Sequence, residues 1–136
     1  VVILNEMVHD ARVIPLVDAE ALPDTVTQWM GHARGHWEDD TLVVDTTNFN
    51  DTPGLSGASR NLHVVERFTP LNEDTLLYQF TVDDPTVWTE PWRGEYVWPA
   101  TSDRIYEYAC HEANYSLGGI LRGARLLEEE AREQIR

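Results

Sequence analysis

Lysine is absent from this sequence, in which all ten basic residues are arginine. A lysine Schiff base or lysine nucleophile is therefore excluded throughout the 136 residues. The arginines stand against 24 acidic residues, so the formal net charge is -14 at pH 7. Because binding to a phosphate backbone depends on clustered cationic side chains, we expect no nucleic acid partner.

Cysteine is nearly absent, since Cys110 is the only one. The chain can form neither an internal disulfide nor a zinc site built from several cysteines. We expect Cys110 to be a small hydrophobic residue buried on a strand. A disulfide to a cysteine outside this sequence is one alternative, and a catalytic thiol assisted by the neighbouring His111 is another.

Several familiar sequence signals are also missing. No apolar run approaches the ~20 residues of a membrane-spanning helix, so we expect no membrane insertion. There is no GxSxG elbow, phosphate-binding glycine loop, dinucleotide fingerprint or HExxH helix, so we expect no nucleotide cofactor. The abrupt start at Val1, without an initiator methionine, leads us to expect an upstream segment.

What the sequence does contain is a succession of short β-strand patterns. Runs of β-branched and aromatic residues are separated by turn-forming residues and can pair as four hairpins. The predicted strands are 1–8, 11–17, 32–38, 41–49, 62–69, 75–83, 92–98 and 104–111. About eight strands at this spacing, over about 1–111, predict a mainly β fold: an antiparallel barrel or strongly curved sandwich in a single domain, 1–136.

The hairpin at 32–49 has an acidic tip, Asp39-Asp40, and we expect it to supply a central pair of strands through Trp37, Leu42 and Val44. After residue 111 the pattern changes to a helical period. Apolar residues recur at that spacing in an amphipathic helix predicted over about 117–134: Leu117, Ile120, Leu121, Ala124, Leu127 and Ala131. We expect this helix to cover an open end or edge of the sheet, with partner binding as the alternative.

Glu66 is the first candidate for chemistry. Its strand alternates so that Leu62, Val64, Glu66 and Phe68 share one face, while His63 points to the other. A carboxylate in an apolar row must be paired, hydrogen-bonded or protonated, which makes Glu66 a candidate general acid or base. The alternative is a structural ion pair with an arginine, such as Arg12, Arg93 or Arg104.

His111 and Glu112 are the other catalytic candidates. They end the last predicted strand, at a position where polar groups can converge on the mouth of a barrel. On the same strand, Tyr106 and Tyr108 share one face and are candidate ligand contacts or core aromatics. Trp37, Trp92, Trp98 and His63 complete the set of candidate ligand contacts.

His32 and His36 suggest a metal site only if they lie on a helix, where residues four apart converge. Gly31 and Gly35 argue against a helix. On a strand, the two histidines share a face but stand roughly 13 Å apart, too far for one ion to bind both. No metal ligands are therefore assigned, and His32, His36, His63 and His111 stay as candidates for a divalent ion.

Four stretches together resemble a group of uncharacterised bacterial proteins: WEDDTLVVDTTNFN, NLHVVERFT, FTVDDPTVWTEPW and YEYACHEANYSLGGILRGAR. The usual forms in that group look like GxWEGDTLVVDT, LHVVERF, DDPxxxTRPW and YEYACHEGNY. This chain departs from them at Asp39, Glu90 and Ala113, where the group has Gly, Arg and Gly.

The resemblance carries no known reaction. Members of the group are longer, look exported and have an additional cysteine-bearing region before the counterpart of Val1. The resemblance thus implies the C-terminal β domain of a periplasmic or secreted protein, with an upstream cysteine as a candidate partner for Cys110.

These observations lead to three functional hypotheses. The first is a small-molecule-binding β domain, with acid-base chemistry available from Glu66 and His111 on a sugar-like or aromatic substrate. The second is a non-catalytic binding or assembly module, including a homo-oligomer. The third is a metal-dependent enzyme using histidine and carboxylate ligands for zinc, copper or iron.

Overall fold

The computed structural model describes residues 1–7, 10–16, 22–106 and 115–134. These residues form seven strands and one helix: β1 (Val2–Leu4), β2 (Ala11–Val13), β3 (His32–Glu38), β4 (Thr41–Thr47), β5 (His63–Asn72), β6 (Thr75–Asp83), β7 (Trp92–Pro99) and α1 (Tyr115–Gln134). The mainly β class with a C-terminal helix, predicted from the sequence, is confirmed.

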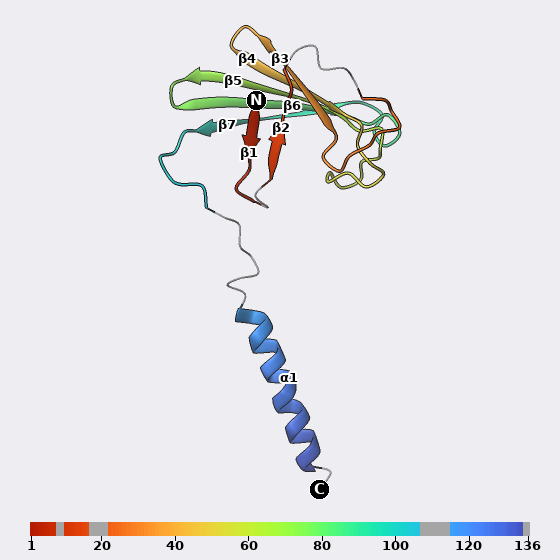
Figure 1. The fold of residues 1–136 in the computed structure, drawn as a ribbon, viewed down its shortest axis with the longest axis vertical. Helices are drawn as coiled ribbons and strands as arrows, with labels where there is room; N and C mark the ends of the chain where they lie inside the picture. Colours follow the sequence, from red (N-terminus) through yellow and green to blue (C-terminus); the bar gives the residue numbers. More distant parts are fainter. Residues whose placement is uncertain (8–9, 17–21, 107–114, 135–136) are drawn as a thin grey trace. The chain divides into compact units, whose positions relative to one another are not determined.

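The strands form two antiparallel sheets, which Figure 1 shows as a short β1–β2 hairpin and a larger sheet. In the larger sheet the five strands follow one another in the order β3-β4-β5-β6-β7. Because this meander leaves β3 and β7 at opposite edges, the described strands do not close into a barrel. The barrel alternative is therefore wrong, and the architecture is an open, sandwich-like arrangement.

The hairpins are confirmed with small differences in length. At the tip of the β3–β4 hairpin, Glu38 pairs with Thr41, and Asp39 adopts a left-handed conformation with φ 52°. The connection predicted over 70–74 is shorter, since β5 continues to Asn72 and the pairing with β6 shifts between Pro70 and Asn72. An irregular ladder tolerates a proline, which has no N–H group to donate.

Three of the predicted strands differ from the structure in length or are not formed where they can be compared. β1 and β2 each have three residues, far fewer than expected, although Val8 and Val17 lie outside the described residues. The predicted strand 104–111 is wrong where it can be compared, because Arg104, Ile105 and Tyr106 form no strand. Residues 107–111 lie outside the described part of the chain.

The β1–β2 hairpin contributes to the first of two hydrophobic clusters. Ile14, directly after β2, is buried against Leu42 and Val44 of β4. The chain after β2 comes close to Gly35 of β3, whose N–H donates to the carbonyl of Pro15 at 2.8 Å. A Cβ at this position would stand only 2.8 Å from the Cγ2 of Ile14. The contact therefore depends on glycine.

The second cluster lies where the sheet meets its long loops. Phe49, Leu62 and Val82 are buried there, with Leu55 and Ala58 of the loop 50–62 packed against them. Of the residues expected in the core, Leu42 and Val44 are confirmed. Trp37 is not, because it lies on the edge strand β3 and its side chain is 53% exposed.

The chain divides into two compact units. The first, Val1–Asn5 with Asp10–Arg104, contains both sheets, and the second, Glu6–His9 with Ile105–Arg136, contains α1. The helix begins two residues before the predicted 117 and ends at Gln134 as predicted. The described residues include no helix long and apolar enough to cross a membrane. That α1 covers the sheet stays a prediction.

Candidate functional site

One face of the five-stranded sheet, which we call the aromatic face, gathers most of the large side chains. Residues directly opposite one another on neighbouring antiparallel strands share a face, so the register identifies its members. From β3 to β7 they include Trp37, Leu42, Val44, Val64, Glu66, Phe68, Tyr78, Phe80, Val82, Trp92, Gly94, Tyr96 and Trp98. His63, Arg67 and Val97 lie on the opposite face.

Glu66 stands in the middle of the aromatic face and is buried, as its place in an apolar row predicted. Arg12 of β2 reaches it with two guanidinium nitrogens, donating from Nη1 to Oε1 at 2.9 Å and from Nη2 to Oε2. The hydroxyl of Tyr78 donates to the same Oε1 at 3.0 Å. Both carboxylate oxygens are thus occupied, and the pair joins the β1–β2 hairpin to the larger sheet.

The interactions among Arg12, Glu66 and Tyr78 shift the pKa values of Arg12 and Tyr78. Hydrogen bonding to Glu66 raises the pKa of Arg12 above its usual value. Burial, the charge of Glu66 and the hydrogen bond to it raise the pKa of Tyr78 well above its usual range. Tyr78 is therefore a hydrogen-bond donor at any physiological pH. Glu66 forms an ion pair with Arg12, one of the arginines that the sequence offered as partners.

Aromatic rings extend from Tyr78 across β6 and β7. Tyr78 stacks on Trp98, with ring centroids 4.6 Å apart and planes 16° from parallel. Phe80 meets Trp92 edge to face at 5.6 Å, and Trp92 meets Trp88 at 5.9 Å. The Phe80 ring covers Gly94, where an added Cβ would collide with it. Glycine at this position lets the ring lie flat on the sheet.

An apolar cavity of about 400 Å³ opens beside these rings. Twelve residues line it, none charged and six aromatic: Trp29, Met30, Phe49, Gly54, Leu55, Leu62, Val64, Tyr78, Phe80, Val82, Trp92 and Tyr96. The sheet supplies one wall, and residues before β3 and in the loop 50–62 supply the others. Its size lies in the range of small-molecule sites, roughly 300–1,000 Å³.

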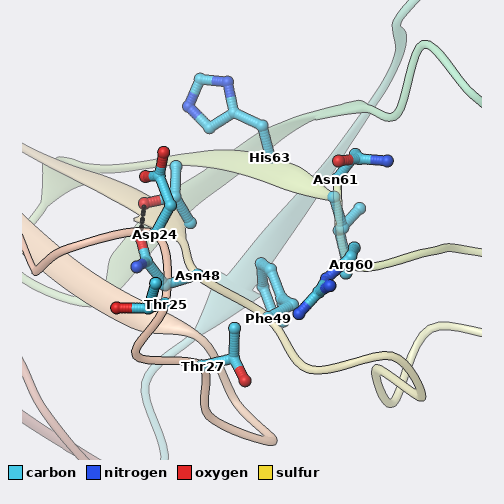
Figure 2. Close-up of a pocket in the computed structure, with 10 residues that line it drawn as sticks. Asp24, Thr25, Thr27, Asn48, Phe49, Arg60, Asn61 and His63 are labelled. Carbon is cyan, nitrogen blue, oxygen red and sulfur yellow. Dashed lines mark hydrogen bonds between the residues drawn. The ribbon is translucent and has the colours of Figure 1, made fainter.

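A second, polar pocket of about 710 Å³ adjoins the same end of the sheet and shares Phe49 and Leu62 with the first. Figure 2 shows Asp24, Thr25 and Asn48 on one side and Arg60 and Asn61 on the other. His63 is at its rim, where its Nε2 lies 2.9 Å from the Asp45 carboxylate.

Asn48 holds one wall of the polar pocket. It has a left-handed backbone, φ 56°, which asparagine tolerates better than most residues. Its Nδ2 donates to the carbonyls of Pro23 and Val26, each at 3.0 Å. The segment that carries Asp24 and Thr25 is therefore fixed to the end of β4.

Replacing Asn48 by alanine should lower the free energy of unfolding by about 2 kcal/mol, because it removes these hydrogen bonds and strains the backbone. Asn48→Gly should cost less, since glycine keeps the backbone and loses only the hydrogen bonds. Urea denaturation of both variants measures the difference. Equal losses would contradict a contribution from the backbone conformation.

Asp84, directly after β6, fixes the other wall. The carboxylate is fully buried and accepts hydrogen bonds from the N–H of Ser59 at 2.7 Å and from the N–H and hydroxyl of Thr86 at 3.1 and 2.6 Å. Burial raises its pKa, but the hydrogen bonds from Thr86 and Ser59 outweigh burial and hold the pKa below the usual range. This carboxylate anchors the loop 50–62.

The structure brings together only part of the predicted site. Trp92 lines the apolar cavity, and Trp37 and Trp98 share the aromatic face with Glu66. His63 lies on the opposite face, at the polar pocket. Tyr106 belongs to the other unit, where its N–H donates to the Glu6 carboxylate at 3.0 Å. Tyr108, His111 and Glu112 lie outside the described residues.

The metal candidates are dispersed in the described part of the chain. His32 and His36 lie on one face of β3, as the strand argument expected, and the Nε2 of His36 contacts Glu38 at 3.2 Å. Hydrogen bonds from Arg67 and His36 hold the pKa of Glu38 below its usual value. Among the residues described, no three His, Cys, Asp or Glu side chains are placed to hold one ion. His111 lies outside those residues.

Sequence reasoning missed the residues that line the cavity from β6 and from the loops, notably Tyr78, Phe80 and Trp29. A signal for two of them was present. Splitting 75–83 by parity places Tyr78 and Phe80 on one face, and the hairpin with 62–69 sets that face beside Glu66. No local pattern marked Trp29 or Asp84.

Comparison of the chain with protein-family models and with characterised proteins, and of its fold with solved structures, finds no match. The two pockets are the features of this structure that bear on function.

Proposed function

We propose that this domain binds a small aromatic or otherwise hydrophobic organic molecule in the apolar cavity on the aromatic face. One observation carries the proposal: a cavity of about 400 Å³ has six aromatic residues among the twelve that line it and no charged residue. Exposed aromatic surface is costly in water, and covering it with a ligand ring is favourable. Trp29 and Tyr96 are each more than half exposed.

The cavity also has a polar component that could orient a ligand. Tyr78 lines it and is held by Glu66, which is itself held by Arg12. Because the O–H of Tyr78 is donated to Glu66, the phenol oxygen is left as an acceptor, and a ligand hydroxyl could donate to it at the edge of a hydrophobic site. This combination of apolar walls with a few placed polar groups is common in small-molecule sites.

The same contacts favour binding over catalysis at this site. A general base needs a free oxygen within reach of the substrate proton. Both oxygens of Glu66 accept hydrogen bonds from Arg12, and one of them also accepts from Tyr78. We therefore propose a binding domain, and assign Glu66 the task of positioning Tyr78 and the β1–β2 hairpin.

Fluorescence titration with 2-naphthol tests the proposal, because Trp29 and Trp92 line the cavity and report on its occupation. We expect saturable quenching, and a loss of affinity of about tenfold in Tyr96→Ala, equivalent to one lost aromatic contact. Val97→Ala is the matched control, since Val97 is equally exposed on the same strand but faces the other way. Absence of saturable binding, or equal losses in both variants, would contradict the proposal.

A further inference from the structure

The polar pocket is large enough to be a binding site in its own right, and its chemistry differs from that of the apolar cavity. We propose that it takes a neutral, polyhydroxylated ligand: a sugar or a sugar-like polyol. This inference does not depend on the proposed function, because the two pockets share only the buried side chains of Phe49 and Leu62.

The side chains around the pocket are those that bind adjacent hydroxyl groups. A vicinal diol donates and accepts at neighbouring positions, and planar amide, carboxylate and guanidinium groups match it with paired atoms. Arg60 and Asn61 carry such groups on one side of the pocket and Asp24 on the other, and Figure 2 shows Phe49 between the two sides. Thr25, Thr27 and Thr47 add hydroxyl groups.

Charge favours a neutral ligand over an anion. The Arg60 guanidinium is compensated by Asp51, 3.2 Å from its Nε, and the Nε2 of His63 lies 2.9 Å from the Asp45 carboxylate. An anion would also meet Asp24 and the formal charge of -14 carried by the whole chain. An anion is therefore disfavoured, and hydrogen bonds to uncharged hydroxyl groups suit this lining.

Both walls are fixed before any ligand arrives. Asn48 holds the segment that carries Asp24 and Thr25 through its bonds to Pro23 and Val26. Asp84 holds Ser59, next to Arg60, at 2.7 Å. A prearranged site avoids part of the entropic cost of ordering its side chains around a weakly held ligand.

The test is a titration of the full ¹⁵N-labelled chain with the methyl glycosides of glucose, galactose, mannose and xylose, followed by amide chemical shifts. At least one glycoside should give saturable shifts confined to residues 24–27, 47–49 and 60–63, with a dissociation constant of about 1 mM. Arg60→Ala and Asn61→Ala should each weaken binding about tenfold, because both side chains line the pocket and are exposed there.

Arg93→Ala is the matched control, since Arg93 is an exposed arginine on β7 that does not line this pocket, and it should leave binding unchanged. Tighter binding of the matching oligosaccharides would support the proposal and identify a glycan chain as the source of the sugar. Shifts with none of the four glycosides would overturn the proposal. So would glycoside shifts that persist in both pocket variants, or stronger, salt-sensitive shifts with sodium acetate, which would identify an anion site.

Discussion

Replacing Glu66 by glutamine is expected to lower the free energy of unfolding by about 3 kcal/mol, because it leaves the Arg12 guanidinium without its counter-charge in a largely buried position. The side chains of Arg12 and Glu66 are 18% and 7% exposed, so water can replace little of the lost interaction. Urea denaturation at pH 7 measures the loss. The amides of β1 and β2 should also exchange faster, since the pair holds that hairpin to the sheet.

A double-mutant cycle provides the control. Arg12→Met alone should cost as much as Glu66→Gln or more, since it leaves a buried carboxylate unpaired. Arg12→Met with Glu66→Leu removes both charges, and this double variant should be more stable than either single variant. Additive losses would contradict a coupled pair. A Glu66→Gln variant as stable as the parent would return Glu66 to the role of general acid or base that its place in the sequence first suggested.

Replacing Asp84 by asparagine is expected to cost about 3 kcal/mol at pH 7, since a fully buried carboxylate loses charge-assisted hydrogen bonds from Ser59 and Thr86. Asparagine also turns a donor amide toward groups that themselves donate. The loop 50–62 supplies Leu55 to the apolar cavity and Arg60 and Asn61 to the polar pocket. Binding at both pockets should therefore weaken together in this variant.

The stability difference between the parent and Asp84→Asn should depend on pH, because the pKa of Asp84 is lowered in the folded parent. The ionised carboxylate stabilises the fold fully above its unfolded pKa, about 4, and this contribution is lost as the pH falls through the lower folded pKa. The stability difference between parent and Asp84→Asn should therefore be constant from pH 5 to pH 7 and shrink below about pH 4. Asp40→Asn, at the exposed hairpin tip, is the control and should show little loss at any pH. A difference that grows in acid would contradict the assignment.

The strands were predictable because they depend on local alternation and on turn residues. The hairpins at 32–49 and 62–83 have strong β-branched runs separated by short acidic or proline-containing connections, and their strands were placed within a few residues. At 104–111 the same alternation is present, but Arg104–Tyr106 form no strand. A pattern of alternating residues becomes a strand only where another strand offers its backbone hydrogen bonds.

The candidate site was predictable only in part, for a related reason. Parity within one strand correctly separated Glu66 from His63, because successive side chains on a strand point to opposite faces. It could not choose between the arginines, since Arg12 is 54 residues from Glu66 in the sequence and reaches it only through the packing of β2 on the sheet. Trp29 and Asp84 were missed because loop residues follow no period.

In the β3–β4 hairpin, the features that the sequence determines can be separated from those that depend on the tertiary structure. The sequence by itself determined its two strands, the Asp39-Asp40 tip and the alternation that places Leu42 and Val44 on one face. Only the tertiary structure decided that β3 is an edge strand, so that Trp37 is exposed, and that Gly35 admits the chain after β2. Local alternation fixes which side chains share a face, whereas strand order and long-range contacts decide which face is covered and where a cavity remains.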